Sequence, residues 1–171
     1  MDSGAVRADL EEVFCDTYPR VVAVAARVLG SRDQAEDVAQ EVFLAFGRSS
    51  VPAAEAMRWL SVAAAHTALN HLRSGRRRSA REEAAVSDAA FPDVADAVVT
   101  SDEHRRVRAA LARLPRRQAV ALVLRHSGLS YAEVAAALDL SPSSVGTIVR
   151  RAESALRNEL GKELNRDASS D

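Results

Sequence analysis

Apolar residues recur every three or four positions through most of this 171-residue chain, and that spacing constrains the fold more than any other feature. Residues at steps of three and four lie on one face of an α-helix, so the pattern predicts a series of amphipathic helices. The seven Gly and five Pro, in a chain rich in Ala, Leu, Arg and Glu, also favour helices over strands and tight turns. We expect an all-α fold built from two small helical domains.

Charged residues are distributed unevenly, although the formal net charge is only -1. Residues 82–103 carry seven acids and no Lys or Arg, whereas residues 104–171 carry 12 bases against seven acids. The middle block also contains Pro92 and loses the apolar periodicity, which predicts an acidic flexible linker between domains at 1–81 and 104–171. The basic faces of the two domains can bind a polyanion while the whole chain stays nearly neutral.

The sequence lacks the patterns of several other protein classes. The lone Cys15 has no partner for an internal disulfide, and the four His residues do not have zinc-site spacing with it. No phosphate-binding Gly loop and no nucleophile with a base is present, so we expect no catalytic residue, metal or cofactor. No apolar run reaches 18 residues and no signal peptide is recognisable, so we expect a cytoplasmic protein without membrane insertion.

The segment from Ser130 to Leu160 has the pattern of a helix-turn-helix. Ser130 and Glu133 form a capping box for a short helix, and Ser141 and Pro142 are typical of the start of a second one. Such a second helix can lie in the major groove of DNA. A helical hairpin with solvated polar side chains is the alternative. The outward residues of the second helix are Ser143, Ser144, Thr147, Arg150 and Arg151.

Together with Leu114-Pro115-Arg116-Arg117-Gln118 before it, this segment resembles the fourth conserved region of bacterial sigma factors. Residues 33–48, DQAEDVAQEVFLAFGR, look like the second region, and residues 57–78 look like the segment that follows it. Only the acidic linker separates the matches, so the chain resembles the extracytoplasmic-function (ECF, group 4) sigma factors of the sigma-70 family. The resemblance implies a region 2-like domain at 1–81, a region 4-like domain at 104–171, and promoter-specific transcription initiation as the function.

The resemblance also implies protein partners. Core RNA polymerase would bind through the clamp helices of its largest subunit and through its flap region, and small factors of this group commonly have an anti-sigma protein. A helix face with carboxylates, an amide and an apolar contact suits a basic helical partner, although a solvated acidic face is the alternative. The positions that match the polymerase-docking surface are Asp37, Gln40, Glu41 and Leu44.

The helix expected from about Ala54 to Arg73 corresponds to the family's segment that melts and reads the -10 promoter element. Its polar groups can hydrogen-bond exposed bases, and its arginines can neutralise phosphates. Two of them, His66 and His71, could instead be ordinary surface or core-edge residues. The candidate -10 residues are His66, Thr67, Asn70, His71, Arg73, Arg76, Arg77 and Arg78.

The chain departs from the family at both DNA-binding sites. Where relatives commonly carry Tyr-Arg and Arg-Asn, this chain has Ser61-Val62 and Ala65-His66. Where relatives often carry Lys-Ser-Arg in the recognition helix for the -35 element, it has Gly146-Thr147-Ile148, which should weaken phosphate binding. An alternative function is therefore a sigma-like adaptor or helix-turn-helix regulator that no longer melts promoters, and an enzyme is a third and less favoured interpretation.

Overall fold

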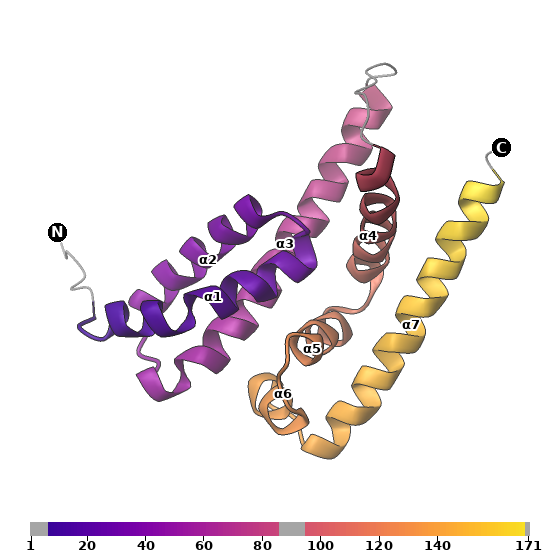
Figure 1. Ribbon diagram of the computed structural model, residues 1–171. Coiled ribbons are helices and arrows are strands. Elements are labelled where there is room, and N and C mark those ends of the chain that lie inside the picture. Colours follow the sequence, from indigo (N-terminus) through magenta and orange to yellow (C-terminus); the bar gives the residue numbers. More distant parts are fainter. Residues whose placement is uncertain (1–6, 86–94, 170–171) are drawn as a thin grey trace.

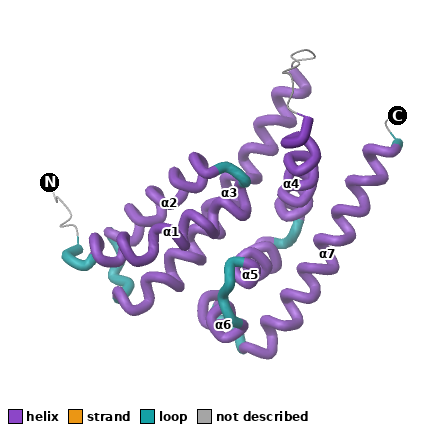
Figure 2. Tube along the Cα trace, in the orientation of Figure 1, coloured by secondary structure: helices purple, strands orange, loops and turns teal. Residues whose placement is uncertain are grey.

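The computed structural model describes residues 7–85 and 95–169, with side chains described for 7–75 and 102–169. Within those ranges the chain is helical and contains no strand, which confirms the predicted fold class (Figures 1 and 2). The helices are α1 (Leu10–Leu29), α2 (Arg32–Gly47), the short 3₁₀ turn η1 (Ala53–Glu55), α3 (Ala56–Ala85), α4 (Ala95–Arg113), α5 (Arg116–His126), α6 (Tyr131–Leu138) and α7 (Pro142–Ala168).

A short turn joins α1 to α2, and its residue types set its geometry. α1 ends at Gly30, whose φ of 67° lies in the left-handed region and whose N–H donates to the Ala26 carbonyl at 2.7 Å. Ser31 followed by Gln34 is a pattern that predicts a helix start. Ser31 does cap α2, because its Oγ accepts the Gln34 N–H at 3.4 Å. The sequence also predicts a bend or break at Pro19, but α1 runs through it unbroken, and the position is exposed so that water can replace the missing N–H bond.

Helices α1, α2 and α3 pack into a bundle that forms the amino-terminal half. Phe46 of α2 is fully buried, with its ring centroid 5.8 Å from that of Trp59 on α3. The Arg7 guanidinium lies 4.2 Å from the centre of the same Phe46 ring. The apolar periodicity of residues 35–46 predicts one buried stripe, and the buried residues of α2 match it: Ala35, Val38, Ala39, Val42, Phe43 and Phe46.

Helix α3 is longer than the sequence pattern predicts. It extends to Ala85, and α4 begins at Ala95, so helices occupy both ends of the acidic segment 82–103. Residues 86–94, the centre of the expected linker, lie outside the described residues. The domain boundaries that we expect from the sequence therefore stay a prediction.

The carboxy-terminal half contains the predicted helix-turn-helix, formed by α6 and α7. In the capping box of α6, the Glu133 N–H donates to Ser130 Oγ at 3.1 Å and the Ser130 N–H donates to the Glu133 carboxylate at 2.6 Å. α6 ends at Asp139, whose φ of 54° is left-handed, and Ser141 caps α7. The predicted inward residues Val145 and Val149 are buried.

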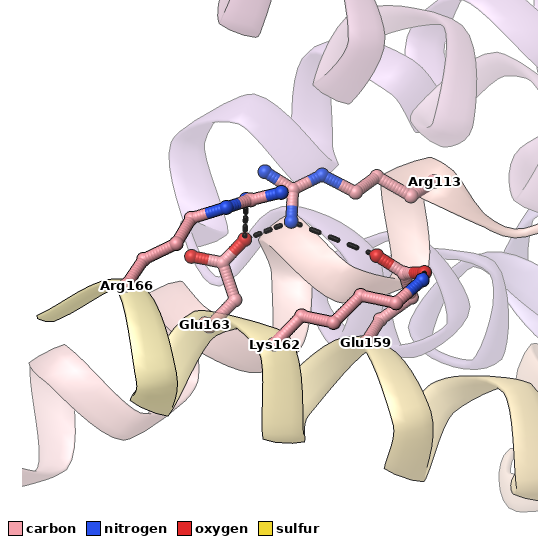
Figure 3. Close-up of polar contacts among 5 residues, drawn as sticks. All are labelled: Arg113, Glu159, Lys162, Glu163 and Arg166. Carbon is pink, nitrogen blue, oxygen red and sulfur yellow. Dashed lines mark hydrogen bonds and ion pairs between the residues drawn. The ribbon is translucent and has the colours of Figure 1, made fainter. Parts of the chain in front are cut away.

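A cluster of charged side chains holds the second half of α7 to the end of α4 (Figure 3). Arg113 of α4 forms ion pairs with Glu159 and Glu163 of α7, and Lys162 and Arg166 flank these carboxylates on α7 itself. One turn closer to the end of α7, Asp167 lies 3.0 Å from Arg106 of α4. These contacts fix the carboxy-terminal part of α7 alongside α4.

The two halves are packed together in this structure. Helices α4 and α5 lie between the α1–α3 bundle and α7, and α3 contacts α4, α5 and α6 (Figure 1). The buried apolar residues of both halves form one continuous cluster. The polar surfaces of α3 therefore face not only solvent but also the second half of the chain.

The neighbouring residues Phe46 and Leu44 provide a test of this packing, since one is fully buried and the other is 63% exposed. We expect Phe46→Ala to lower the free energy of unfolding by about 3–5 kcal/mol, because it removes a buried aromatic side chain and leaves a cavity. Leu44→Ala should change it by less than about 0.5 kcal/mol. Urea titration followed by circular dichroism measures both, and equal effects would contradict the assigned helix orientation.

Candidate functional site

The predicted docking residues lie together on the exposed side of α2. Asp37, Gln40, Glu41 and Leu44 are spaced by three and four residues and form one stripe, and all four are exposed. Leu44 is 63% exposed, whereas its neighbour Phe43 is buried in the core. The stripe therefore presents two carboxylates, an amide and an apolar group to a partner.

Beside this stripe is a hollow of about 580 Å³ that the sequence did not reveal. Phe14, although it is 40% exposed, packs against Phe43 with ring centroids 4.9 Å apart and against Tyr18 at 4.5 Å. The only sequence signal was that Phe14 lies at the edge of the α1 apolar stripe. The hollow is lined by Arg7, Ala8, Leu10, Glu11, Phe14, Gln40, Phe43 and Leu44.

The candidate -10 residues of α3 lie on two different faces. His66, Asn70 and Arg73, at steps of four and three, face the second half of the chain and contact residues 112–116. Thr67 and His71 form a neighbouring stripe, and His71 Nε2 lies 3.3 Å from a Glu41 carboxylate oxygen on α2. The side chains of Arg76, Arg77 and Arg78 lie outside the described residues.

The titration of His66 is clearly perturbed by its surroundings. It is half-buried, and its Nδ1 lies 3.2 Å from Nη1 of Arg116. Burial, and to a smaller extent the Arg116 charge, hold the pKa of His66 below its ordinary value. Because a guanidinium can only donate, Nδ1 accepts this bond as the unprotonated nitrogen of a neutral ring.

The polar residues at the start of α7 are less accessible than the sequence implies. Ser143, Arg150 and Arg151 are exposed, but Ser144 and Thr147 are half-buried. The Ser143 and Ser144 hydroxyls lie 3.1 and 2.7 Å from the Ser141 hydroxyl, so both take part in the helix cap. Of the five predicted residues, Arg150 and Arg151 are therefore the ones that are both exposed and free of the cap hydrogen bonds.

Gly146 lies in the middle of this outward surface. A Cβ built on it meets nothing within 4 Å, so a longer side chain would fit there. Among the residues that the structure describes, no group of His, Cys, Asp and Glu could hold a metal ion. No helix in those ranges is long and apolar enough to cross a membrane.

Comparison with known proteins identifies both halves of the chain. Residues 14–78 match the family described as Sigma-70 region 2, and residues 104–156 match Sigma-70, region 4. The fold is similar to that of the sigma factor RpoE from Bartonella quintana in its complex with the anti-sigma factor NepR, with a TM-score of 0.52 and 21% identity over 91% of this chain and 98% of that one. At this identity the likeness concerns the fold alone.

Curated relatives cover nearly the whole chain. The ECF RNA polymerase sigma factor SigK of Mycobacterium tuberculosis is 32% identical over 165 residues, which are 91% of this chain and 88% of the relative. SigK of Mycobacterium ulcerans is 33% identical over 160 residues, or 88% and 85% of the two chains. These findings do not favour the alternative of an adaptor or simple regulator. With both regions present in the expected order, the chain belongs to the ECF sigma factors of the sigma-70 family, which direct transcription initiation.

Proposed function

We propose that this sigma factor recruits core RNA polymerase through α2 and brings it to promoters through α3 and α7. The observation that carries the proposal is the succession of two sigma regions, each with an exposed polar surface that its own core does not need. Like the family, whose members regulate transcription and are not enzymes, the chain would perform no covalent chemistry. It would act in the cell interior, where promoters and polymerase are found.

Core polymerase would dock on the exposed stripe of α2. Asp37 and Glu41 supply charge that orients a basic partner, and Leu44 supplies apolar area that is buried on docking. The adjoining hollow, with Phe14 at its edge, extends this surface onto α1 and offers a site for one apolar side chain of the partner. We assign the docking surface to α2 together with the face of α1 that carries Leu10, Glu11 and Phe14.

Promoter DNA would contact α3 and α7. On α3, the candidate residues with described side chains, which are His66, Thr67, Asn70, His71 and Arg73, lie on faces that do not belong to the helix's own buried stripe. On α7, Arg150 and Arg151 are placed to meet phosphates, and Thr147, near the helix start, to meet a base edge. The cap hydrogen bonds of Ser143 and Ser144 support a smaller part for these two hydroxyls.

An anti-sigma protein is a further partner that we propose. The structurally similar RpoE is bound to the anti-sigma factor NepR. An inhibitor of this chain would act most directly by covering the α2 stripe and its hollow, because polymerase could then no longer bind the same surface. Co-purification from the native cell tests whether such a protein exists.

Run-off transcription with purified core polymerase tests the proposed function as a whole. We expect the chain to direct transcripts that start at defined promoters, and core polymerase alone to give none of them. If the chain binds polymerase but no promoter-specific product forms, the proposal that it opens promoters is wrong. The adaptor would then be the better interpretation.

Charge reversal on α2 should weaken polymerase binding without changing the fold. We expect the double variant Asp37→Lys, Glu41→Lys to lose at least about tenfold in affinity, because exposed charges at a docking surface guide and orient association. The matched control is Glu12→Lys, Asp16→Lys, which reverses two exposed carboxylates at the same spacing on another face of α1. Competition against the wild type for core polymerase measures both, and equal affinities would remove α2 from the docking surface.

Substitutions in α7 should separate affinity from sequence preference. We expect Arg151→Ala to weaken binding to all DNA and lower the salt dependence by about one unit of slope, because it removes a phosphate contact. Thr147→Ala should change the preference within the -35 element at a cost of roughly 1–3 kcal/mol. Gly146→Lys should strengthen binding and steepen its salt dependence, since the position is open.

Salt-titrated fluorescence anisotropy on promoter DNA and scrambled DNA checks these three variants. Arg105→Ala, which removes an exposed arginine of α4, is the matched control for charge. If the three α7 variants behave as the wild type does, this helix does not contact DNA.

A further inference from the structure

Helix α7 is longer than the part of it that matches the family. The match to Sigma-70, region 4 ends at residue 156, whereas α7 continues without a break to Ala168. We define residues 157–168 as the α7 extension. At a rise of about 1.5 Å per residue, these residues add roughly 18 Å to the helix. The family match therefore gives no account of what the extension does.

Apolar packing is not what holds the extension in place. The buried residues of α7 are Val145, Val149 and Ala152, and all three precede the extension. Within the extension no residue is buried, and Leu164 is 55% exposed. A helix end without a core of its own ordinarily frays. The position of the extension therefore depends on its polar contacts.

Ion pairs at two levels attach the extension to α4. At the first level, Nη1 of Arg113 donates to Glu163 Oε1 and lies 3.7 Å from Glu159 Oε2 (Figure 3). At the second level, Arg106 lies 3.0 Å from Asp167. Lower residue numbers on α4 pair with higher numbers on α7, so the two helices run antiparallel here. We call these five residues the α4–α7 clasp.

The carboxylates of the clasp are shielded from solvent. The side chains of Glu159 and Glu163 are only 19% and 17% exposed, so water screens their charges less than on an open surface. The pKa of Glu159 lies below its ordinary value, chiefly because Lys162 donates a hydrogen bond to it and to a smaller extent because of the Arg113 charge. Arg113 is the last residue of α4, where the helix dipole favours a cation. These features favour an ionised clasp at neutral pH.

Two separate attachments fix the direction of a helix, whereas a single attachment leaves it free to pivot. Arg106 and Arg113 are about two helical turns apart on α4, or roughly 10 Å along its axis. At the other end of α7, the buried Val145 and Val149 attach the helix to the core of the helix-turn-helix. With the clasp formed, α7 is held at both ends and has one direction relative to α4.

The direction of α7 matters because the first half of this helix carries the groups that we propose to meet DNA. Thr147, Arg150 and Arg151 reach base edges and phosphates only when the helix lies correctly in the groove. Gly146 and Ile148 add no charge to this surface, so the number of phosphate contacts is small. A helix that is already held in the binding direction loses little freedom when it binds, and it keeps more of the affinity that these few contacts supply.

We infer that the α4–α7 clasp positions the recognition helix, so that Arg113, Glu159 and Glu163 set the affinity for the -35 element without touching DNA. This inference rests on the proposed role of α7. When the clasp is released, α7 takes several directions, and the apparent affinity falls with the fraction of molecules that have the binding direction. Arg113 is in this sense a positioning residue.

The double variant Glu159→Gln, Glu163→Gln tests the clasp, because positioning and simple electrostatics predict opposite results. Removing two negative charges from a DNA-binding helix ordinarily strengthens binding. If the clasp positions the helix, the same variant binds promoter DNA about three- to tenfold more weakly, the effect expected when two ion pairs are lost. The matched control is Glu103→Gln, Glu153→Gln, which removes two acids of α4 and α7 that are not part of the clasp.

A second variant separates positioning from a general loss of stability. In Arg113→Met, Glu163→Leu an apolar contact replaces the ion pair and the net charge is unchanged. A well-packed apolar pair can hold two helices as firmly as an ion pair does. We therefore expect its promoter affinity to lie within about twofold of the wild type, whereas Arg113→Met alone should weaken binding as the glutamine variant does.

Three measurements on the full chain are needed. Salt-titrated fluorescence anisotropy gives the affinities for a short duplex with the -35 element, taken from a promoter that the run-off assay identifies, and for a scrambled duplex. Electron-electron double resonance between spin labels on Ala136→Cys and Asn165→Cys, both at exposed positions, reports the direction of α7 in a Cys15→Ser background. Circular dichroism at the same temperature checks that every variant is folded.

We expect the glutamine variant to show weaker binding to the -35 duplex, a smaller change on scrambled DNA and a broader distance distribution, and the control to show none of these. Affinity for the -35 duplex at or above the wild-type value would overturn the positioning role. An equal loss on both duplexes would overturn it as well, because positioning acts on the specific contacts.

The α7 variants described above distinguish this failure from a failure of the proposed function. If Thr147→Ala and Arg151→Ala change DNA binding while the glutamine variant does not, only the role of the clasp is wrong. If all of these variants bind DNA as the wild type does, α7 does not contact DNA, and both the inference and the proposed role of this helix are wrong.

Discussion

Helix α3 must bury one long stripe of mostly small side chains, from Ala56 to Leu69, and this requirement sets where the other helices can lie. The stripe includes Leu60, Ala64 and Ala68, all of them fully buried. Alanine side chains allow helices to approach closely, so α1 and α2 pack directly on α3. The faces of α3 outside this stripe are left for polar side chains.

Those polar faces connect the proposed surfaces of the molecule. On one side His71 reaches Glu41, a residue of the docking stripe on α2. On the other side Arg116, the first residue of α5, donates to Asn70 Oδ1. A single helix therefore links the proposed polymerase-docking surface, the proposed -10 face and the second half of the chain.

Two of the departures from the family pattern also affect how α3 packs. Judged from the sequence alone, Ser61 and Ala65 offer fewer contacts to DNA than the residues that relatives carry there. In the structure both are buried, and the Ser61 hydroxyl donates to the Met57 carbonyl within the same helix at 2.7 Å. A long charged side chain at either position would have to leave the core, so in this arrangement small residues are needed there for packing.

The sequence by itself determined most of the helices, though not the full extent of α3 and α4, and it determined the caps at Ser31, Ser130 and Ser141 and the buried stripe of α2. These features depend on residues at most a few positions apart. It also placed the docking residues on one face of α2, since the period of a helix does so. Only the tertiary structure decided that Phe14 borders a hollow beside that face and that Arg116 covers His66 and Asn70. Those contacts join residues some 30 to 50 positions apart, and helical periodicity carries no information about which helices pack together.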